Sequence, residues 1–122
     1  MEALQTRCQT LLVVTNLPDE TSAQALATAL VTERLAACVN VLAPCHSIYR
    51  WQGDIASTQE VPLLIKTSAE RYAALEAAIR ARHPYELPEI IAVPIARGLS
   101  EYLTWIATET LAEQADGNPL SC

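Results

Sequence analysis

The sequence predicts an α+β fold, in which an antiparallel sheet carries two helices on one face. Short apolar runs rich in β-branched residues alternate with amphipathic segments, in the order strand, helix, strand, strand, helix, strand, followed by one more helix. Of the 122 residues, 51% are hydrophobic and 18% are charged, a composition typical of one domain with its own core. The order of elements corresponds to the split βαβ arrangement.

The first strand, helix and second strand are expected between residues 10 and 42. Residues 10–15 (TLLVVT) have the composition of a buried strand. Thr21, with Gln24 three residues later, has the pattern of a capping box. We therefore expect a helix with Thr21 as its N-cap, running to about Leu35. Residues 37–42 (ACVNVL) alternate as a second strand.

A hairpin arm is expected next. Residues 47–51 (SIYRW) alternate as a strand, and residues 52–54 (QGD) form the turn, after which the strand pattern resumes at Ile55. We expect the two arms of this hairpin to extend the neighbouring strands. Residues 61–66 (VPLLIK) read as the following strand. Pro62 has no N–H to donate, so it indicates that this part of the strand lies near an edge or a bulge.

The second half predicts two more helices and one strand. Residues 67–70 (TSAE) repeat the capping-box pattern before a helix that ends at His83, because Pro84 disfavours helical geometry in the residue before it. Residues 90–93 form a strand, and Ser100 is the expected N-cap of the last helix. We expect a single domain over residues 8–113 and a flexible C-terminal tail over residues 114–122, which is polar.

Charge and hydropathy exclude several classes of function. Fourteen acidic against 8 basic side chains give a formal net charge of -6, the wrong sign for nucleic acid and for anionic membrane surfaces. No apolar run approaches the roughly 20 residues that span a bilayer. The start carries no apolar run long enough for a signal peptide, so we expect a cytoplasmic protein.

Four cysteines are present, but none forms a CxxC pair. They are Cys8, Cys38, Cys45 and Cys122. A zinc ribbon and a thioredoxin-type redox site therefore have no support. In a reducing cytosol we expect free thiols.

The predicted sheet has a second face that the C-terminal helix is too small to cover. The hairpin also carries Tyr49 and Trp51 away from the body of the domain. Exposed aromatic residues on such an arm usually dock onto a partner. We therefore expect an oligomer, with Tyr49 and Trp51 as interface anchors; the other interpretation of the two aromatic side chains is a platform on which a ligand stacks.

Several motifs, in order and at consistent spacing, resemble the CutA family of divalent-cation tolerance proteins. The match covers residues 11–107 and includes residues 35–40 (LAACVN), 47–53 (SIYRWQG), 83–90 (HPYELPEI) and 102–106 (YLTWI). The resemblance implies a ferredoxin-like βαββαβ subunit with an extended central hairpin, in a homotrimer similar to the PII signalling proteins. It also implies a response to metal ions and possible copper(II) binding.

Histidine and cysteine side chains are the candidate ligands for copper in this chain. The family's proposed copper site uses a cysteine at the end of the first strand and a His-His pair; the matching residues here are Thr15, Arg82 and His83. His83 is thus a candidate ligand for weak binding, or else a histidine at a helix end. Cys38 is a second candidate, or else a small buried hydrophobe. Adjacent strand residues such as Cys45 and its neighbour His46 point to opposite faces, so they do not share an ion easily.

Four further residues are candidates for a cleft between subunits: Glu60, Lys66, Tyr85 and Glu89. The resemblance places polar residues of this kind near such clefts. One interpretation is a pocket for a small ligand or ion, in which Lys66 supplies positive charge and the carboxylates accept hydrogen bonds. The other is a salt-bridge network between subunits, or solvated strand ends.

Nothing in the sequence indicates an enzyme. The chain has only 3 glycines and lacks both a G-x-S-x-G elbow and a glycine-rich phosphate loop. We expect a divalent-cation tolerance homotrimer that requires no cofactor, with copper(II) as a possible ligand. A PII-like signalling module that binds a small molecule or a partner protein is the alternative, and a trimer without a specific ligand is a third reading.

Overall fold

The computed structural model describes residues 9–112, so the expected tail, Cys8 and Cys122 lie outside the described part. The elements along the chain are β1 (Thr10–Leu17), α2 (Glu20–Thr32), β2 (Cys38–Val41), β3 (Cys45–Trp51), β4 (Asp54–Ser68), a 3-10 turn η1 (Ala69–Arg71), α3 (Tyr72–Arg82), β5 (Ile91–Pro94) and α4 (Ser100–Glu109). The sheet is antiparallel, with strand order β2-β4-β1-β5 and with β3 paired to β4 outside that row. The predicted α+β class is therefore confirmed, but three strands rather than two lie between α2 and α3, because β2 and β3 are separate strands.

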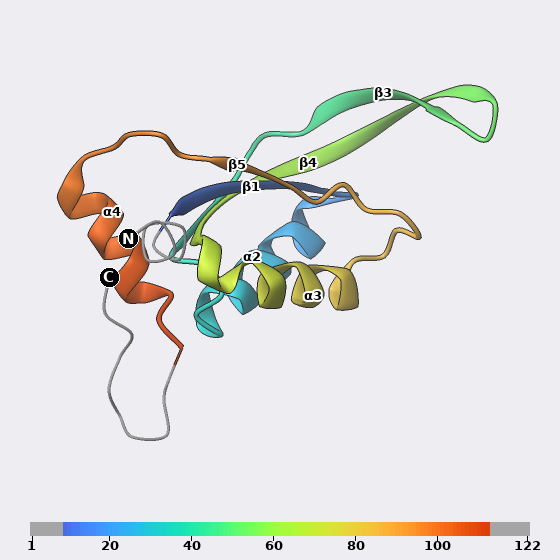
Figure 1. The fold of residues 1–122 in the computed structure, drawn as a ribbon. Helices are drawn as coiled ribbons and strands as arrows, with labels where there is room; N and C mark the ends of the chain where they lie inside the picture. Colours follow the sequence, from blue (N-terminus) through green and yellow to red (C-terminus); the bar gives the residue numbers. More distant parts are fainter. Residues whose placement is uncertain (1–8, 113–122) are drawn as a thin grey trace.

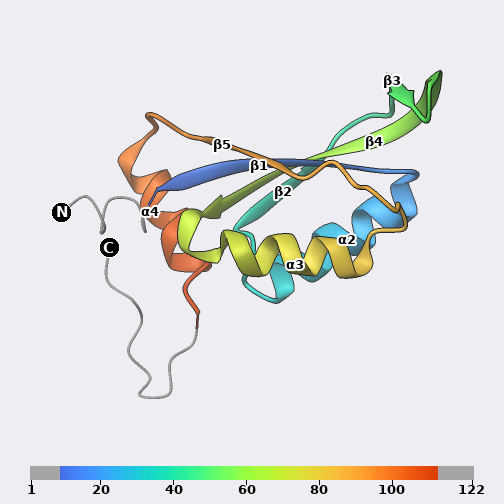
Figure 2. The ribbon, with the colours of Figure 1, turned by 45° about the vertical axis from the view of Figure 1, so that its right-hand side comes forward.

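Helices α2 and α3 lie together along one side of the sheet (Figures 1 and 2). Their apolar positions meet the alternating inward residues of β1 and β4, which are Val13, Leu17, Val61, Leu63 and Ile65. Leu26 and Leu30 of α2 and Leu75 and Ile79 of α3 complete the core. None of the helices in residues 9–112 is long and apolar enough to cross a membrane.

The long strand β4 joins the core to a projecting arm (Figure 1). It has 15 residues; its first half pairs with β3 and its second half with β1. The predicted hairpin is confirmed, and its two-residue turn uses positive φ angles of 51° at Gln52 and 87° at Gly53, as a type I′ turn requires.

The prediction that Pro62 lies near an edge or a bulge is confirmed. It is opposite Asn16 in register with β1, but on its other side the pairing with β2 ends at Leu63 and the pairing with β3 begins at Glu60, with the register shifted by one residue. The amide of Leu42 donates to the Pro62 carbonyl at 2.9 Å. Proline has no N–H to return, and β2 ends one residue earlier, at Val41. Strand β4 accommodates Pro62 because the missing N–H would face the position at which β2 has already ended.

The boundaries of α2 differ from the prediction. The N-cap is Asp19, whose Oδ1 accepts from the Ser22 amide at 2.8 Å, and Thr21 is already helical. A carboxylate caps as well as a hydroxyl, and Asp19 lies two residues before Thr21, directly ahead of the first helical residue Glu20. The helix ends at Thr32 rather than near Leu35, because Arg34 adopts a φ of 59°. The sequence contains no glycine there to signal that left-handed residue.

The other two expected caps are also wrong. Thr67 is still part of β4 and its hydroxyl donates to the Leu35 carbonyl, and the turn η1, with Ser68 as its N-cap, separates it from α3. Helix α4 begins at Ser100 with Leu99 as its N-cap, again without a side-chain bond. The predicted stop of α3 before Pro84 is confirmed, because the helix ends at Arg82 with His83 as its extended C-cap.

The face of the sheet opposite α2 and α3 is only partly covered. We call it the open face; its side chains come from the alternate positions of four strands, including Leu12, Val14, Leu64, Ile91 and Val93. Helix α4 covers one end, where the Thr110 and Ser68 hydroxyls lie 3.1 Å apart. Ile91 and Val93 remain 51% and 50% exposed. The expected uncovered face is therefore present in the subunit.

Candidate functional site

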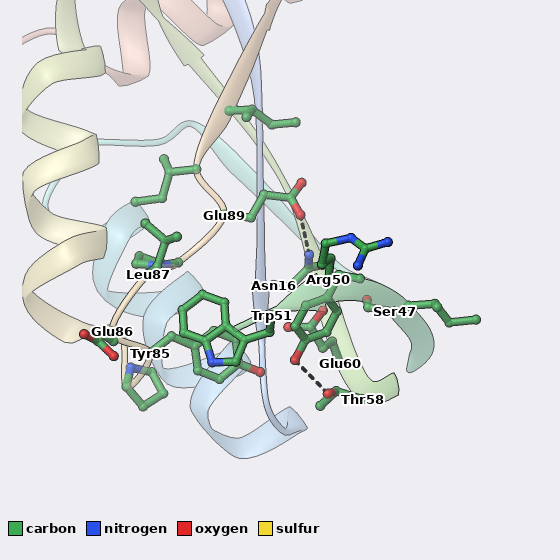
Figure 3. A pocket seen from close by; sticks show the side chains of 16 residues that line it. Asn16, Ser47, Arg50, Trp51, Thr58, Glu60, Tyr85, Glu86, Leu87 and Glu89 are labelled. Atoms are coloured by element: carbon green, nitrogen blue, oxygen red, sulfur yellow. Dashed lines mark hydrogen bonds between the residues drawn. The ribbon is translucent and has the colours of Figure 1, made fainter. Parts of the chain in front are cut away.

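A cleft of about 1060 Å³ lies between the hairpin arm and residues 84–91 (Figure 3). The arm supplies its wall because Tyr49 and Trp51 of β3 share a pleat face with Thr58 and Glu60 of β4. Residues 84–91 supply the other wall, since Pro84 ends α3 and sends the chain across the end of β1 before β5 begins. The predicted residues Glu60, Tyr85 and Glu89 all line this cleft.

Tyr85 and Glu60 form the polar centre of the cleft. Glu60 is buried, with only 8% of the residue exposed. Burial, and then a hydrogen bond donated to the Glu60 carboxylate, raise the pKa of the Tyr85 phenol to about 12. The two side chains are therefore coupled, and the phenol of Tyr85 ionises only in strongly alkaline solution.

Two further hydrogen bonds stiffen the walls (Figure 3). The Asn16 amide donates to Glu89 Oε1 at 3.0 Å, which ties residues 84–91 to the end of β1. The Tyr49 and Thr58 hydroxyls lie 2.9 Å apart across the arm. Asn16 and Thr58 were not among the predicted site residues. Strand parity was the available signal, because both lie on the same face as the selected residues.

His83 lies beside the cleft and is only 9% exposed. Its Nδ1 accepts from the Tyr85 amide at 3.2 Å, so the other ring nitrogen carries the proton. That nitrogen, Nε2, donates to the Asn16 carbonyl at 2.6 Å. Both ring nitrogens are thus engaged with backbone groups, and His83 orders the start of residues 84–91.

Lys66 does not line the cleft. It lies on the open face, where Nζ donates to Asn40 Oδ1 and is 3.9 Å from Cys38 Sγ. Cys38 is partly buried. The burial of Tyr102 in α4, and next the nearby thiol of Cys38, raise the pKa of the Tyr102 phenol. Lys66 and Glu60 share a face of β4, but six residues separate them by about 20 Å at ~3.3 Å per residue.

The residues present do not fit the copper site that the resemblance implies. Thr15 Oγ1 is buried and has no hydrogen-bond partner, and a neutral hydroxyl is a poor substitute for a thiolate. Arg82 is ion-paired with Glu33 at 2.5 Å. His83 has no nitrogen lone pair directed outward. Within residues 9–112, no group of three His, Cys, Asp or Glu side chains is placed to hold a metal ion.

Comparison with known proteins agrees with the fold. The family model described as CutA1 divalent ion tolerance protein matches residues 11–109. This chain belongs to the CutA1 family. Divalent-cation tolerance protein CutA from Thermus thermophilus is 48% identical over 98 residues, covering 80% of this chain and 95% of the relative. The namesake from Pectobacterium atrosepticum is 38% identical over 99 residues, covering 81% and 90%.

Solved CutA structures have the same subunit architecture. The Thermus thermophilus protein aligns with a TM-score of 0.81 and 46% identity, covering 83% of this chain and 98% of its own. CutA from Xylella fastidiosa aligns with a TM-score of 0.81 and 51% identity, covering 83% and 97%. The resemblance to the CutA family in the sequence is confirmed, and so is its α+β subunit with an antiparallel sheet and three helices.

Proposed function

We propose that this CutA1-family chain acts as a cytoplasmic homotrimer in the response to divalent cations, through its contact surfaces rather than through catalysis. The arm is the observation that supports this proposal. It projects beyond the rest of the sheet (Figure 2). Two of its side chains, Ile48 and Ile55, are 73% and 66% exposed. An isolated two-stranded ribbon is only marginally stable in water, and a partner subunit provides the apolar surface that such side chains need.

The open face supplies the complementary surface. Ile91 and Val93 are half-exposed and adjoin Leu12 and Val14 across the β1–β5 ladder. An apolar sheet face without a covering layer is typical of surfaces that become buried on association. An arm from one subunit and an open face from the next form the heterologous contact from which a ring closes.

Native mass spectrometry of the full chain tests the assembly. We expect a trimer for the wild type and a shift to monomer for the double variant Ile48→Lys with Ile55→Lys. Val31→Lys is the matched control, because Val31 is a 43% exposed apolar residue on α2. A wild-type monomer, or a trimer that survives the double change on the arm, contradicts the proposal.

Copper(II) at Thr15, Arg82 and His83 is not part of this proposal, because those residues do not fit it. Titration of the metal-free protein with copper(II), with zinc(II) as a control, tests that view. We expect no stoichiometric uptake that depends on His83. Discrete uptake of copper that His83→Ala abolishes contradicts it.

The second candidate is a PII-like module whose cleft binds a small molecule. The volume of the cleft and its convergent polar groups at Glu60 and Tyr85 support this candidate. A ligand that binds the native state raises the unfolding temperature in proportion to RT ln(1 + [L]/Kd). A thermal-shift screen is the test, and compounds whose effect disappears in Tyr85→Phe support the cleft.

A further inference from the structure

Glu60 is a buried carboxylate without a cation beside it. Only 8% of the residue is exposed, and its carboxylate accepts a hydrogen bond from the Tyr85 phenol, which carries no charge to balance it. Arg50, the basic residue that lines the same cleft, lies five residues along β3 from Cys45, the position opposite Glu60. At ~3.3 Å per residue that separation is about 16 Å. No ion pair within residues 9–112 includes Glu60.

Lys66 is the complementary case on the open face. Its Nζ donates to Asn40 Oδ1, which belongs to a neutral amide, and lies 3.9 Å from Cys38 Sγ. In the described part of the chain its ammonium group is not in an ion pair either. Lys66 is already partly buried in the subunit. A layer that covers the open face removes more water from it, and a buried charge without a counter-charge is strongly destabilising.

These two charges cannot meet within one subunit. Glu60 and Lys66 share a face of β4 six residues apart, about 20 Å at ~3.3 Å per residue, whereas an ion pair needs nitrogen and oxygen within about 4 Å. They do lie on the two surfaces that the proposed trimer brings together. Glu60 is at the base of the arm and Lys66 is on the open face, so one contact between subunits buries a carboxylate and an ammonium group together.

The surroundings of the two residues have complementary charge. Glu86 and Glu89 line the cleft together with Glu60 (Figure 3), and an excess of acidic groups on a concave surface attracts a cation. The ammonium group of Lys66 lies at the end of a flexible four-carbon stem, and its partner Asn40 is exposed. The side chain can therefore turn away from Asn40 toward a stronger acceptor.

We propose that the partner subunit's Lys66 enters each cleft and pairs with Glu60, so that a residue of the adjacent subunit completes the cleft. This inference rests on the proposed trimer and names the residues that fix the register of its subunits. In a closed ring the pair is repeated at every contact, because each subunit offers Glu60 to one neighbour and Lys66 to the other.

Charge reversal and rescue test the pair in the full-length protein. Glu60→Lys and Lys66→Glu each place like charges together at every contact, so each is expected to raise the concentration at which the trimer dissociates about tenfold or more. The double variant restores opposite charges, and we expect it to return to within about threefold of the wild type. Native mass spectrometry along a dilution series measures this concentration. If the trimer persists throughout, the unfolding temperature is compared in the same four proteins.

Rescue is diagnostic because the two residues are so far apart in a subunit. The effects of distant changes add when each acts within its own subunit, so only a contact between subunits lets one reversal cancel the other. Lys66→Glu combined with Glu89→Lys is the matched control, since Glu89 is an exposed carboxylate of the same cleft. We expect no rescue there.

A second cycle with neutral side chains covers the case in which a reversed charge prevents folding. Glu60→Gln and Lys66→Met each leave the other charge buried and unpaired, so the double change is expected to cost less than the sum of the single ones. Circular dichroism shows which variants are folded.

Two results overturn the inference while the trimer stands. One is a double variant, in both cycles, whose loss equals the sum of the single losses; the other is rescue by Glu89→Lys in place of Glu60→Lys. A wild-type monomer contradicts the proposed trimer itself, and the pair with it.

Discussion

The imidazole of His83 joins the end of β1 to the backbone of Tyr85. Nε2 donates to the Asn16 carbonyl at 2.6 Å while Nδ1 accepts from the Tyr85 amide at 3.2 Å. A residue that the sequence offered as a metal ligand is thus a buried structural histidine. The cleft wall that follows depends on it.

Replacing this histidine is expected to reduce stability. His83→Ala leaves a buried carbonyl and an amide without partners, which costs about 1–3 kcal/mol. Urea unfolding measures the change, and His46→Ala, an exposed position on β3, is the control. Equal stability of the two variants contradicts the structural role.

Two buried threonines give opposite predictions. Thr15 and Thr67 are both 0% exposed, but Thr67 Oγ1 donates to the Leu35 carbonyl at 2.8 Å while Thr15 Oγ1 has no partner. Thr67→Val therefore costs about 1–3 kcal/mol, and Thr15→Val stabilises by about 1 kcal/mol. Unfolding midpoints of the two variants decide the matter, and loss of stability in Thr15→Val contradicts the assignment.

The Tyr85 phenol predicts a loss of stability at high pH. Its pKa of about 12 in the folded state exceeds the ordinary value of about 10. The stabilising contribution is therefore complete below the ordinary value and disappears as pH rises through the folded one. NMR titration of the Tyr85 ring measures it, and Glu60→Gln is expected to lower the pKa. Ionisation at the ordinary value contradicts the contact with Glu60.

The cap of α2 predicts the opposite dependence on pH. Hydrogen bonds from Ser22 lower the pKa of Asp19. Its contribution is therefore present above the ordinary aspartate value and is lost as pH falls through the lowered one. Asp19→Ala is expected to destabilise the protein at neutral pH and much less in acid, whereas Thr21→Ala has little effect at either pH. Thermal unfolding at both pH values compares them.

The strands and helices could be predicted from the sequence, whereas the residues at which they begin and end often could not. Hydrophobic periodicity located the strands and helices because the core imposes it, as Val13 and Leu75 illustrate. Caps depend on one or two local hydrogen bonds, so Asp19 and Thr21 could not be ranked by residue type alone. The left-handed Arg34 has no sequence signal, since most such positions carry glycine.

The site was predicted in part for a similar reason. Glu60 and Tyr85 come from distant parts of the chain, and only the family motifs brought them together. Lys66 shares its strand face with Glu60, but pleat parity does not give distance along a strand. The contacts of His83 could not be predicted from spacing, because its partner Asn16 is 67 residues away.

Strand β4 leaves no hinge between the arm and the core. It runs unbroken from Asp54 to Ser68 and changes partner from β3 to β1 between Glu60 and Val61. The length of the arm is thus set by the number of residues in its two strands. Successive side chains along each strand point to opposite faces. Residues inserted between the core and Tyr49 keep the aromatic side chains on the cleft face only in steps of two on each strand, about 7 Å at a time. A step of one would turn Tyr49 and Trp51 away from the cleft.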